Sequence, residues 1–505
     1  MKLTELSQLL GAQACGHLNV AVDRVEYDSR KMTGKAIFAA VRGARYDGHQ
    51  FIEQALAQGA IAILSELAPP PGLTAPWLQV SDVREAMALA AAAITDSPSR
   101  KIRLVGVTGT NGKTTTAYLI NSVFEATGEK SAMVGTVGYH IGNSMVAAER
   151  TTPEAPDIQR ILLKAVGAGC RHAVMEVSSH AIDLKRVYGC EFAAAVFTNL
   201  TRDHLDYHKT MEAYFEVKRR LFEGVTGKVP DHAVINRDDP YGLGLLRSVK
   251  SGRLTYGLTS EADVHPQSLD LLGTGLRFTA NTPVGPVRVV SELIGQTNAY
   301  NLLACLATAV VLNIDVQAIE AGIAACRAVP GRFEAIREGQ DFTVIVDYAH
   351  TDDALKNVLK TARQLGPRRV ITVFGCGGDR DPGKRAPMGR VAAEFSDRVI
   401  VTSDNPRSED PEEIIGQIAA GIPHGYSTFT KVVDRRGAIA LAIQEAHTGD
   451  LVLLAGKGHE GYQVLKDRAI PFDDREVARE LLRKRLAQND RYDELGLNSM
   501  LSVAV

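Results

Sequence analysis

The chain has 505 residues with a formal net charge of -2, and 45% of its residues are hydrophobic while 23% are charged. This length exceeds what one hydrophobic core organises, so it predicts roughly three domains. The apolar content excludes a largely disordered chain, and the near-neutral charge excludes a general basic footprint, so we expect no nucleic-acid partner.

The beginning of the chain and its cysteines bear on location. MKLTELSQLL lacks the charged start and apolar core of a signal peptide, and no apolar run approaches the ~20 residues of a membrane span. The six cysteines have no CxxC pair or metal-ligand spacing, which is typical of buried thiols in a reducing compartment. We therefore expect a cytoplasmic protein without membrane insertion, and a monomer.

In chain order, residues 1–98 come first and contain short alternating segments, among them a helix-like FIEQALAQGA and a strand-like IAILSE. An alanine-rich helix is predicted over residues 84–95, and SPSRK follows it as a linker. We take residues 1–98 as the first domain.

From Ile102 onward, apolar strands alternate with helices. The strands of residues 99–330 include IRLVGVTG, AVMEVSSH, AAAVFTNL and HAVINRDD, and those of residues 331–505 include FTVIVDYAH, RVITVFGCGGD, RVIVTSDNPR and DLVLLAGKGHE. This alternation predicts an α/β fold with mainly parallel sheets covered on both faces. Residues from about 489 to 505 show no periodicity, which predicts a loose tail.

A glycine-rich turn in VTGTNGKTTTA, residues 107–117, joins a strand to a helix. Its glycines let backbone N–H groups converge on phosphate, the helix offers its positive end, and the following Lys and Thr residues supply a cation and a Mg²⁺ ligand. The GxxxxGK[ST] pattern fails by one position, because Val107 stands where its first Gly belongs. A structural turn with an exposed lysine is the alternative. The predicted ATP-binding residues are Gly109, Thr110, Asn111, Gly112, Lys113, Thr114 and Thr115.

Two polar segments follow later strands of the same predicted sheet. Glu176 ends one strand, and TNLTRDHLDYH, residues 198–208, brings Asp203, His204, Asp206 and His208 after another. Mg²⁺ prefers hard oxygen ligands, so these segments predict a Mg²⁺ site beside the phosphate loop. Solvated surface groups are the alternative.

Five motifs occur together in the order found in the Mur ligases, the ATP-dependent amide-forming enzymes of bacterial cell-wall precursor synthesis. They are GTNGKTT at 109–115, EVSSH at 176–180, TNLTRDHLDYH at 198–208, GQTNAYN at 295–301 and PGRFE at 330–334. The chain resembles this family over nearly its whole length. The resemblance implies a three-domain architecture, with a P-loop-type central parallel-sheet domain and a Rossmann-like C-terminal domain.

The resemblance also implies a catalytic set of Lys113, Lys218 and His204. Mg²⁺ would be held by Thr114, Glu176, His204 and Lys218, the last carboxylated to a carbamate. Asn301 and Arg332 would contact ATP. Asp347 and His350 are candidates either for nucleotide contact or for bracing a domain junction.

Within the family the chain looks like the branch that adds the third amino acid to UDP-N-acetylmuramoyl-L-alanyl-D-glutamate. The contacts that this resemblance implies for the UDP substrate are Ser29, Ala44, Arg45, Tyr46, Thr151, Thr152, Ser178 and Arg186. Leu184 stands where relatives have a polar Gln, so this chain lacks one hydrogen-bonding side chain.

SDNPRSED, residues 403–410, follows another strand. Pro406 restricts Asn405 to an extended or turn conformation, and a guanidinium at Arg407 can bind a carboxylate through two parallel hydrogen bonds. A turn with a solvated arginine is the alternative. In the family, DNPR is typical of members that take meso-2,6-diaminopimelate, and the implied contacts are Arg380, Asp404, Asn405, Pro406, Arg407, Gly456 and Glu460.

The implied reaction forms an acyl phosphate from ATP and the D-glutamate γ-carboxylate, which the incoming amine then attacks. A ligase like folylpolyglutamate synthase is one alternative, although it would not need DSR…GARYDGH or DNPR. A nucleotide-binding module without chemistry is another.

Overall fold

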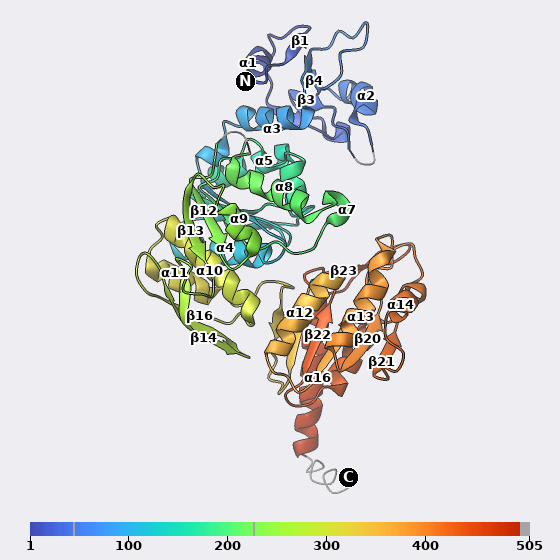
Figure 1. Ribbon diagram of the computed structural model, residues 1–505. Coiled ribbons are helices and arrows are strands. Elements are labelled where there is room, and N and C mark those ends of the chain that lie inside the picture. Colours follow the sequence, from blue (N-terminus) through green and yellow to red (C-terminus); the bar gives the residue numbers. More distant parts are fainter. Residues whose placement is uncertain (44–45, 226–227, 495–505) are drawn as a thin grey trace. The chain divides into compact units, whose positions relative to one another are not determined.

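The computed structural model describes residues 1–43, 46–225 and 228–494, with side chains described to residue 488 (Figure 1). The chain forms two compact units. The first comprises Met1–Gln267, Thr279–Arg288 and Tyr300–Ala325. The second comprises Ser268–Phe278, Val289–Ala299 and the chain from Cys326 onward.

The first unit begins with a five-stranded sheet of order β1-β5-β4-β3-β2. Strands β2 to β5 pair in parallel, and β1 is antiparallel to β5. The strands are β1 (Gln13–Cys15), β2 (Arg24–Glu26), β3 (Ala36–Ala39), β4 (Ala62–Ser65) and β5 (Trp77–Gln79), and the helices are α1 (Leu3–Leu9), α2 (Ile52–Ala57) and α3 (Val83–Ile94). The predicted helix over residues 84–95 is confirmed as α3, which Asp82 caps by accepting a hydrogen bond from the backbone N–H of Glu85.

A second sheet of the first unit has eight strands in the order β13-β12-β11-β6-β10-β7-β8-β9. They are β6 (Arg103–Thr108), β7 (Ser131–Val134), β8 (Tyr139–Ile141), β9 (Ser144–Val146), β10 (His172–Glu176), β11 (Ala194–Phe197), β12 (His232–Asn236) and β13 (Gly252–Tyr256). All pairs from β13 to β7 are parallel, whereas β8 and β9 are antiparallel. The four strands predicted for this region are β6, β10, β11 and β12.

The register of this sheet aligns the ends of three strands. Glu176 of β10 pairs with Val107 of β6, and Phe197 of β11 pairs with Thr108 of β6. The segments that leave β6, β10 and β11 therefore start at one edge of the sheet. The helices of this region are α4 (Lys113–Ala126), α5 (Ala155–Gly167), α6 (Ser179–Asp183), α7 (Leu205–His208), α8 (Met211–Glu223), α9 (Pro240–Leu245), α10 (Gln296–Val311) and α11 (Val316–Ala325).

A small three-stranded sheet is formed by β14 (His265–Leu272), β15 (Gly275–Asn281) and β16 (Val287–Ser291). The second unit contains a six-stranded sheet of order β17-β18-β22-β19-β20-β21, in which only the β17–β18 pair is antiparallel. Its strands are β17 (Glu334–Ile336), β18 (Thr343–Asp347), β19 (Val370–Phe374), β20 (Arg398–Thr402), β21 (Phe429–Val432) and β22 (Leu451–Ala455). A hairpin of β23 (Tyr462–Val464) and β24 (Ala469–Pro471) follows.

Helices cover both faces of the six-stranded sheet, as Figure 1 shows for α12 and α13 on one face. The side chains of successive β22 residues alternate between two cores: Leu451 and Leu453 pack with α12, α13 and α14, while Val452 and Leu454 pack with α15 and α16. The helices are α12 (Asp352–Gln364), α13 (Arg385–Phe395), α14 (Pro411–Ala419), α15 (Arg435–Glu445) and α16 (Asp474–Glu494). This doubly covered parallel sheet is the predicted Rossmann-like fold.

Two expectations are wrong. The predicted tail from about residue 489 is still helical as far as Glu494, because α16 begins at Asp474 with good helix formers and continues past its last buried residue; residues 495–505 lie outside the described chain. Cys15 is exposed, since the short edge strand β1 has no buried position, whereas the other five cysteines are buried as expected.

A fully buried ion pair joins the first turns of α15 and α16. Arg435 donates from Nε to Asp474 Oδ1 at 2.8 Å and from Nη2 to Asp474 Oδ2 at 2.6 Å, and both side chains are 0% exposed. We expect Asp474→Ala to lower the free energy of unfolding of the second unit by about 3–5 kcal/mol, because it leaves a buried guanidinium without its partner. Urea denaturation measures this. Glu480→Ala removes an exposed partner of Arg436 and serves as the control. It should change the free energy of unfolding of the second unit little. Equal losses in the two variants would contradict the prediction.

Candidate functional site

The predicted phosphate loop is a close-packed turn between β6 and α4. A Cβ at Gly109 would lie 1.9 Å from Thr198 Oγ1, and a Cβ at Gly112 would lie 2.4 Å from Asn301 Oδ1. Gly112 also has a φ of +83°. These two positions therefore require glycine for space, and Gly112 also for its backbone conformation.

The segment after β11 holds the loop in shape. Thr198 Oγ1 donates to the Asn111 carbonyl at 2.6 Å, and the backbone N–H of Asn111 donates to Asn199 Oδ1 at 2.9 Å. Lys113 curls back over the turn, where its Nζ donates to the carbonyls of Gly109 and Thr110 at 2.8 Å each. The lysine therefore already lies at the mouth of the loop, at the N-terminal end of α4.

Glu176 lies beside the first turn of α4, with 1% of its surface exposed. Its Oε2 accepts a hydrogen bond from Thr114 Oγ1 at 2.9 Å, and its Oε1 accepts one from the backbone N–H of Thr136 at 2.8 Å. Thr116 is fully buried and donates to Asn301 Oδ1 at 3.4 Å, as expected of a structural residue of the helix. The structure thus joins the loop, Glu176 and Asn301 into one site.

His204 lies in the same region, on the segment after β11. It has a φ of +52° and precedes α7, and its Nε2 lies 3.4 Å from Asp203 Oδ2. Desolvation lowers the pKa of His204, as does the positive charge of Lys113, while Asp203 opposes them. The imidazole is therefore neutral at neutral pH, which is the form that binds metals.

Lys218 is almost completely buried, with 1% of its surface exposed, although it lies in the charged helix α8. Its Nζ donates to the Gly109 carbonyl at 2.9 Å and lies 4.8 Å from the centre of the Tyr214 ring. No carboxylate forms an ion pair with Lys218 among the residues that the structure describes. Burial, and next the charge of Lys113, lower the pKa of Lys218 well below its ordinary value. The geometry therefore favours an uncharged amine against the phosphate loop.

The described residues contain no group of three His, Cys, Asp or Glu side chains that could hold a metal ion. Glu176 and His204 supply two such ligands in the region of the phosphate loop. An ammonium at Lys218 would repel a cation there. The donor set fits Mg²⁺ only if Lys218 itself provides oxygen.

Four of the eight residues predicted to bind the UDP substrate come together beside Glu176. Thr152 Oγ1 donates to the Glu176 carbonyl at 2.8 Å and accepts from the backbone N–H of Ser178 at 3.1 Å. Arg186 Nη1 donates to the Thr152 carbonyl at 3.1 Å. Thr151 lies next to them, with its Oγ1 3.1 Å from Thr136 Oγ1.

Two more predicted substrate residues, Ser29 and Tyr46, belong to the region of the five-stranded sheet. Ser29 is buried and donates to Gln54 Oε1 at 3.0 Å. Tyr46 is 69% exposed, so it is free to meet a ligand. Ala44 and Arg45 lie outside the described residues. Leu184 is the C-terminal cap of α6.

In the second unit, the DNPR loop is held with Arg407 in a left-handed conformation, φ +52°. Arg407 Nη1 donates to the Gly378 carbonyl at 2.8 Å, and a Cβ at Gly378 would lie 1.9 Å from the Pro406 carbonyl oxygen. Nε and Nη2 of Arg407 make no hydrogen bond to another described residue. The loop therefore holds the arginine by one nitrogen and leaves its other edge to a ligand. Arg380, two residues after Gly378, is exposed, and its Nη1 donates to the Asp379 carbonyl.

Two more predicted amino-acid contacts, Gly456 and Glu460, are next to this loop. Asn405 Nδ2 donates to Glu460 Oε2 at 2.8 Å. A Cβ at Gly456 would lie 2.7 Å from Asp404 Oδ2, and Gly456 has a φ of +114°. Asp404, Asn405 and Pro406 are buried, so the loop is a rigid part of the unit.

Arg332 and the end of β18 form a separate cluster of the second unit. The Arg332 guanidinium lies 4.8 Å from the centre of the Tyr348 ring, which lies 5.1 Å from the His459 ring. Asp347 accepts from the backbone N–H groups of Phe333 and Ala349 at 2.7 and 2.8 Å, so it holds this loop in shape. Both of its predicted roles, nucleotide contact and bracing of a domain junction, stay predictions. His350 is exposed, with Nδ1 2.9 Å from the Tyr348 carbonyl oxygen.

The sequence interpretation missed Tyr348 and Lys457. Tyr348 adjoins Asp347 and His350 in VDYAH, and Lys457 lies between two glycines in AGKGHE. Neither has a local signal. Lys457 contacts Asn405, which is 52 residues away in the chain, and the rings that pack with Arg332 come from separate segments.

A phosphate loop at the edge of a parallel sheet, next to a buried carboxylate and in a chain with a Rossmann-like second unit, defines a nucleotide-binding α/β protein of several domains. Three family models match it: the Mur ligase family catalytic domain at residues 21–95, the Mur ligase middle domain at 107–309, and the Mur ligase glutamate ligase domain at 331–458. The chain belongs to the Mur ligase family, and its fold is the family's three-domain architecture.

Relatives and solved structures agree with this assignment. The UDP-N-acetylmuramoyl-L-alanyl-D-glutamate--2,6-diaminopimelate ligase of Solibacter usitatus is 51% identical over 462 residues, covering 92% of this chain and 94% of that protein. A solved structure of a ligase with the same name is 34% identical, with a TM-score of 0.70, covering 96% of this chain and 99% of that one. The MurF ligase of Thermotoga maritima in complex with ADP is 19% identical with a TM-score of 0.61, covering 93% and 99%, and shares the fold. Across the described residues, every helix is too short or too polar to span a membrane.

Proposed function

We propose that this chain is an ATP-dependent ligase that joins meso-2,6-diaminopimelate to UDP-N-acetylmuramoyl-L-alanyl-D-glutamate in the cytoplasm, as a monomer. The observation that carries the proposal is the DNPR loop, which offers one edge of Arg407 beside Asn405 and Glu460. Diaminopimelate has a second amino-acid end, with one carboxylate and one ammonium, that this arginine and this glutamate match in charge. The printed name of the 51% identical relative supports the same activity.

Residues of the central region would bind and activate ATP. The backbone N–H groups of residues 109–115 and the ammonium of Lys113 would stabilise the charge on the transferred phosphoryl group. Asn301 accepts a hydrogen bond from Thr116 in the first turn of α4, and Arg332 would contact the nucleotide from the C-terminal region. We assign residues 1–98 to UDP binding, 99–330 to ATP binding and 331–505 to amino-acid binding.

Mg²⁺ would be held by Thr114, Glu176, His204 and a carbamate formed on Lys218, and when bound it neutralises phosphate charge. The support for the carbamate is the buried amine of Lys218, which has no counter-ion among the described residues and a lowered pKa. An uncharged amine attacks CO₂, one proton leaves, and the product is an anion with two oxygens. This replaces a buried cation with a ligand suited to the divalent ion.

The reaction has two steps. A γ-carboxylate oxygen of D-glutamate attacks the γ-phosphorus of ATP, the bond to the ADP oxygen breaks, and an acyl phosphate forms. The amine of diaminopimelate then attacks the acyl carbon, and the tetrahedral intermediate loses phosphate and a proton to leave the amide. Ser29, Tyr46, Thr151, Thr152, Ser178 and Arg186, together with Ala44 and Arg45, would position the UDP substrate for this attack.

Phosphate release tests the proposal. Purified protein with ATP and Mg²⁺ should release phosphate rapidly only when both UDP-N-acetylmuramoyl-L-alanyl-D-glutamate and diaminopimelate are present. ATP turnover that is indifferent to both would favour a nucleotide-binding module instead. Turnover with folate and glutamate would favour a folylpolyglutamate synthase.

Arg407→Lys should raise the KM for diaminopimelate by about tenfold to a hundredfold, because a lysine cannot replace the paired hydrogen bonds of a guanidinium. The KM values for ATP and for the UDP substrate should stay within twofold of the wild type. Steady-state kinetics measures all three. Arg390→Lys, at an exposed position of α13, is the matched control. A uniform effect on all three KM values would count against a carboxylate contact.

A further inference from the structure

Lys457 is a second buried lysine, in the loop that follows β22. Its side chain is 0% exposed, and it lies between Gly456 with φ +114° and Gly458 with φ +53°. A buried ammonium has lost its hydration and needs partners inside the protein. Its interactions therefore indicate what it does.

The ammonium of Lys457 contacts the two side chains that meet at the DNPR loop. Its Nζ lies 3.2 Å from Glu460 Oε2 and donates to Asn405 Oδ1 at 3.3 Å. The ring of Tyr462 covers it at 5.7 Å from Nζ to the ring centre. The single carboxylate that pairs with Lys457 among the described residues is thus Glu460.

These contacts determine how Asn405 is oriented. Its Oδ1 accepts from both Lys457 and the backbone N–H of Val464, at 2.9 Å for the latter, so its Nδ2 faces Glu460. Glu460 Oε2 then receives two donors, from Asn405 and Lys457. Glu460 Oε1 has no hydrogen-bond partner within the part of the chain that is described, so it is the oxygen left for a ligand.

We propose that Lys457 is a positioning residue for amino-acid selection, which fixes the Asn405–Glu460 pair so that Glu460 presents one oxygen to the ammonium of the incoming amino acid. The proposal rests on the proposed function. Lys457 and Asn405 occupy Oε2 of Glu460, so only an ammonium that reaches Oε1 is bound well. Diaminopimelate, whose far end places an ammonium beside the carboxylate that Arg407 accepts, fits this arrangement.

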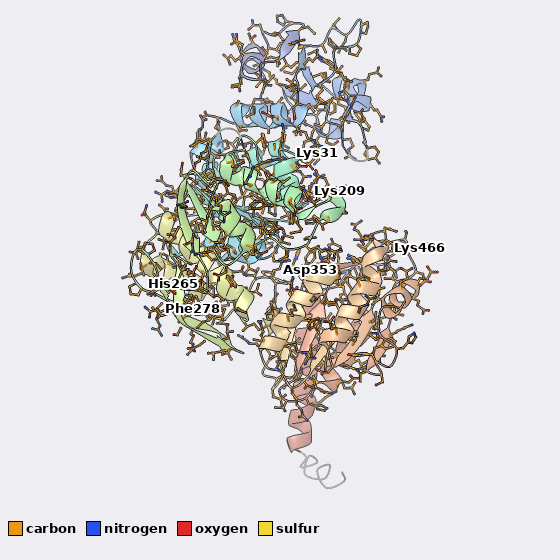
Figure 2. The ribbon with its side chains drawn as sticks, in the orientation of Figure 1. Lys31, Lys209, His265, Phe278, Asp353 and Lys466 are labelled. Atoms are coloured by element: carbon orange, nitrogen blue, oxygen red, sulfur yellow. The ribbon has the colours of Figure 1, made fainter. Side chains whose placement is uncertain are left out.

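Removing the ammonium tests this role. In Lys457→Met, the methionine has nearly the volume of the lysine stem, while Asn405 and Glu460 lose their common donor. We expect the KM for diaminopimelate to rise at least tenfold, with kcat and the KM for ATP within threefold of the wild type. Lys466→Met, at an exposed position between β23 and β24 of the same unit (Figure 2), is the matched control and should leave all three unchanged.

A double-mutant cycle with Glu460→Gln shows whether Lys457 acts through Glu460. We expect the double variant to resemble Glu460→Gln in its KM for diaminopimelate, within threefold, so that the two effects do not multiply. The double variant also removes both charges of the Lys457–Glu460 pair together, so it should fold even if Lys457→Met alone does not. Independent, multiplicative effects, or a fall in kcat with unchanged KM, would overturn the proposal.

The wild-type enzyme separates this inference from the proposed function. If wild-type phosphate release does not depend on diaminopimelate, the proposed function fails. If it does depend on diaminopimelate but Lys457→Met keeps the wild-type KM, the inference about Lys457 alone is wrong.

Discussion

Lys218→Met should abolish phosphate release, lowering kcat by about a thousandfold or more, while leaving the thermal midpoint unchanged or higher. The loss of activity and the retained stability both follow from removing the buried amine of Lys218. The 1% exposed amine has no carboxylate partner among the described residues, so a methionine of similar length removes a desolvated polar group and keeps the packing against Tyr214. The same change removes the proposed carbamate and with it the charge that would hold Mg²⁺.

Dependence on CO₂ separates the carbamate from other roles of Lys218. Wild-type activity should fall in buffer depleted of CO₂ and bicarbonate and recover when bicarbonate is added, whereas Lys218→Met should not respond. A variant that loses stability in proportion to activity, or a wild type indifferent to bicarbonate, would contradict the proposed modification.

Lys113→Met should lower kcat by about a hundredfold to a thousandfold at saturating ATP. The reason is that Lys113 places an ammonium at the mouth of the phosphate loop, within 2.8 Å of two of its carbonyls, where charge develops on the transferred phosphoryl group. Single-turnover measurement of acyl-phosphate formation tests the effect on the chemical step.

Lys250→Met, at an exposed position of the same unit, is the control for Lys113→Met and should keep full activity. Lys113 also donates hydrogen bonds to two carbonyls of the loop, so its replacement could lower stability. Comparing the thermal midpoints of the two variants separates a loss of stability from a loss of catalysis. A Lys113 variant with wild-type kcat and a raised KM for ATP alone would reduce its role to ground-state binding.

The sequence predicts the strands and the phosphate loop well because their signals are local. LVGV followed by a glycine turn and Lys113 describes β6, the loop and the start of α4 within a dozen residues. Buried parallel strands are apolar along their whole length, so β10, β11, β19 and β22 stand out equally.

The burial of Lys218 was predictable from periodicity, although FEVKRRLF looks like a charged helix. Tyr214, Val217 and Leu221 are buried at helical spacing on α8, and Lys218 lies four residues after Tyr214 on the same face. A lysine on the apolar face of an amphipathic helix signals a buried amine.

What supports the DNPR loop was not predictable from local sequence. Lys457 and Gln463 contact the loop from more than fifty residues away, with Gln463 Nε2 donating to the Asp404 carbonyl at 2.7 Å. Arg435 donates to the carbonyl of Ala455 at 3.1 Å, beside Gly456. Such contacts depend on how β20 and β22 are ordered in the sheet, which a single sequence does not specify.

The central claim is tested most directly by competition between amino acids. Purified protein, ATP, Mg²⁺ and UDP-N-acetylmuramoyl-L-alanyl-D-glutamate are incubated with equimolar meso-diaminopimelate and lysine, and the UDP-linked tripeptide product is identified by mass spectrometry. We predict almost exclusive incorporation of diaminopimelate, and loss of that preference in Arg407→Lys. Predominant incorporation of lysine by the wild type would contradict the account.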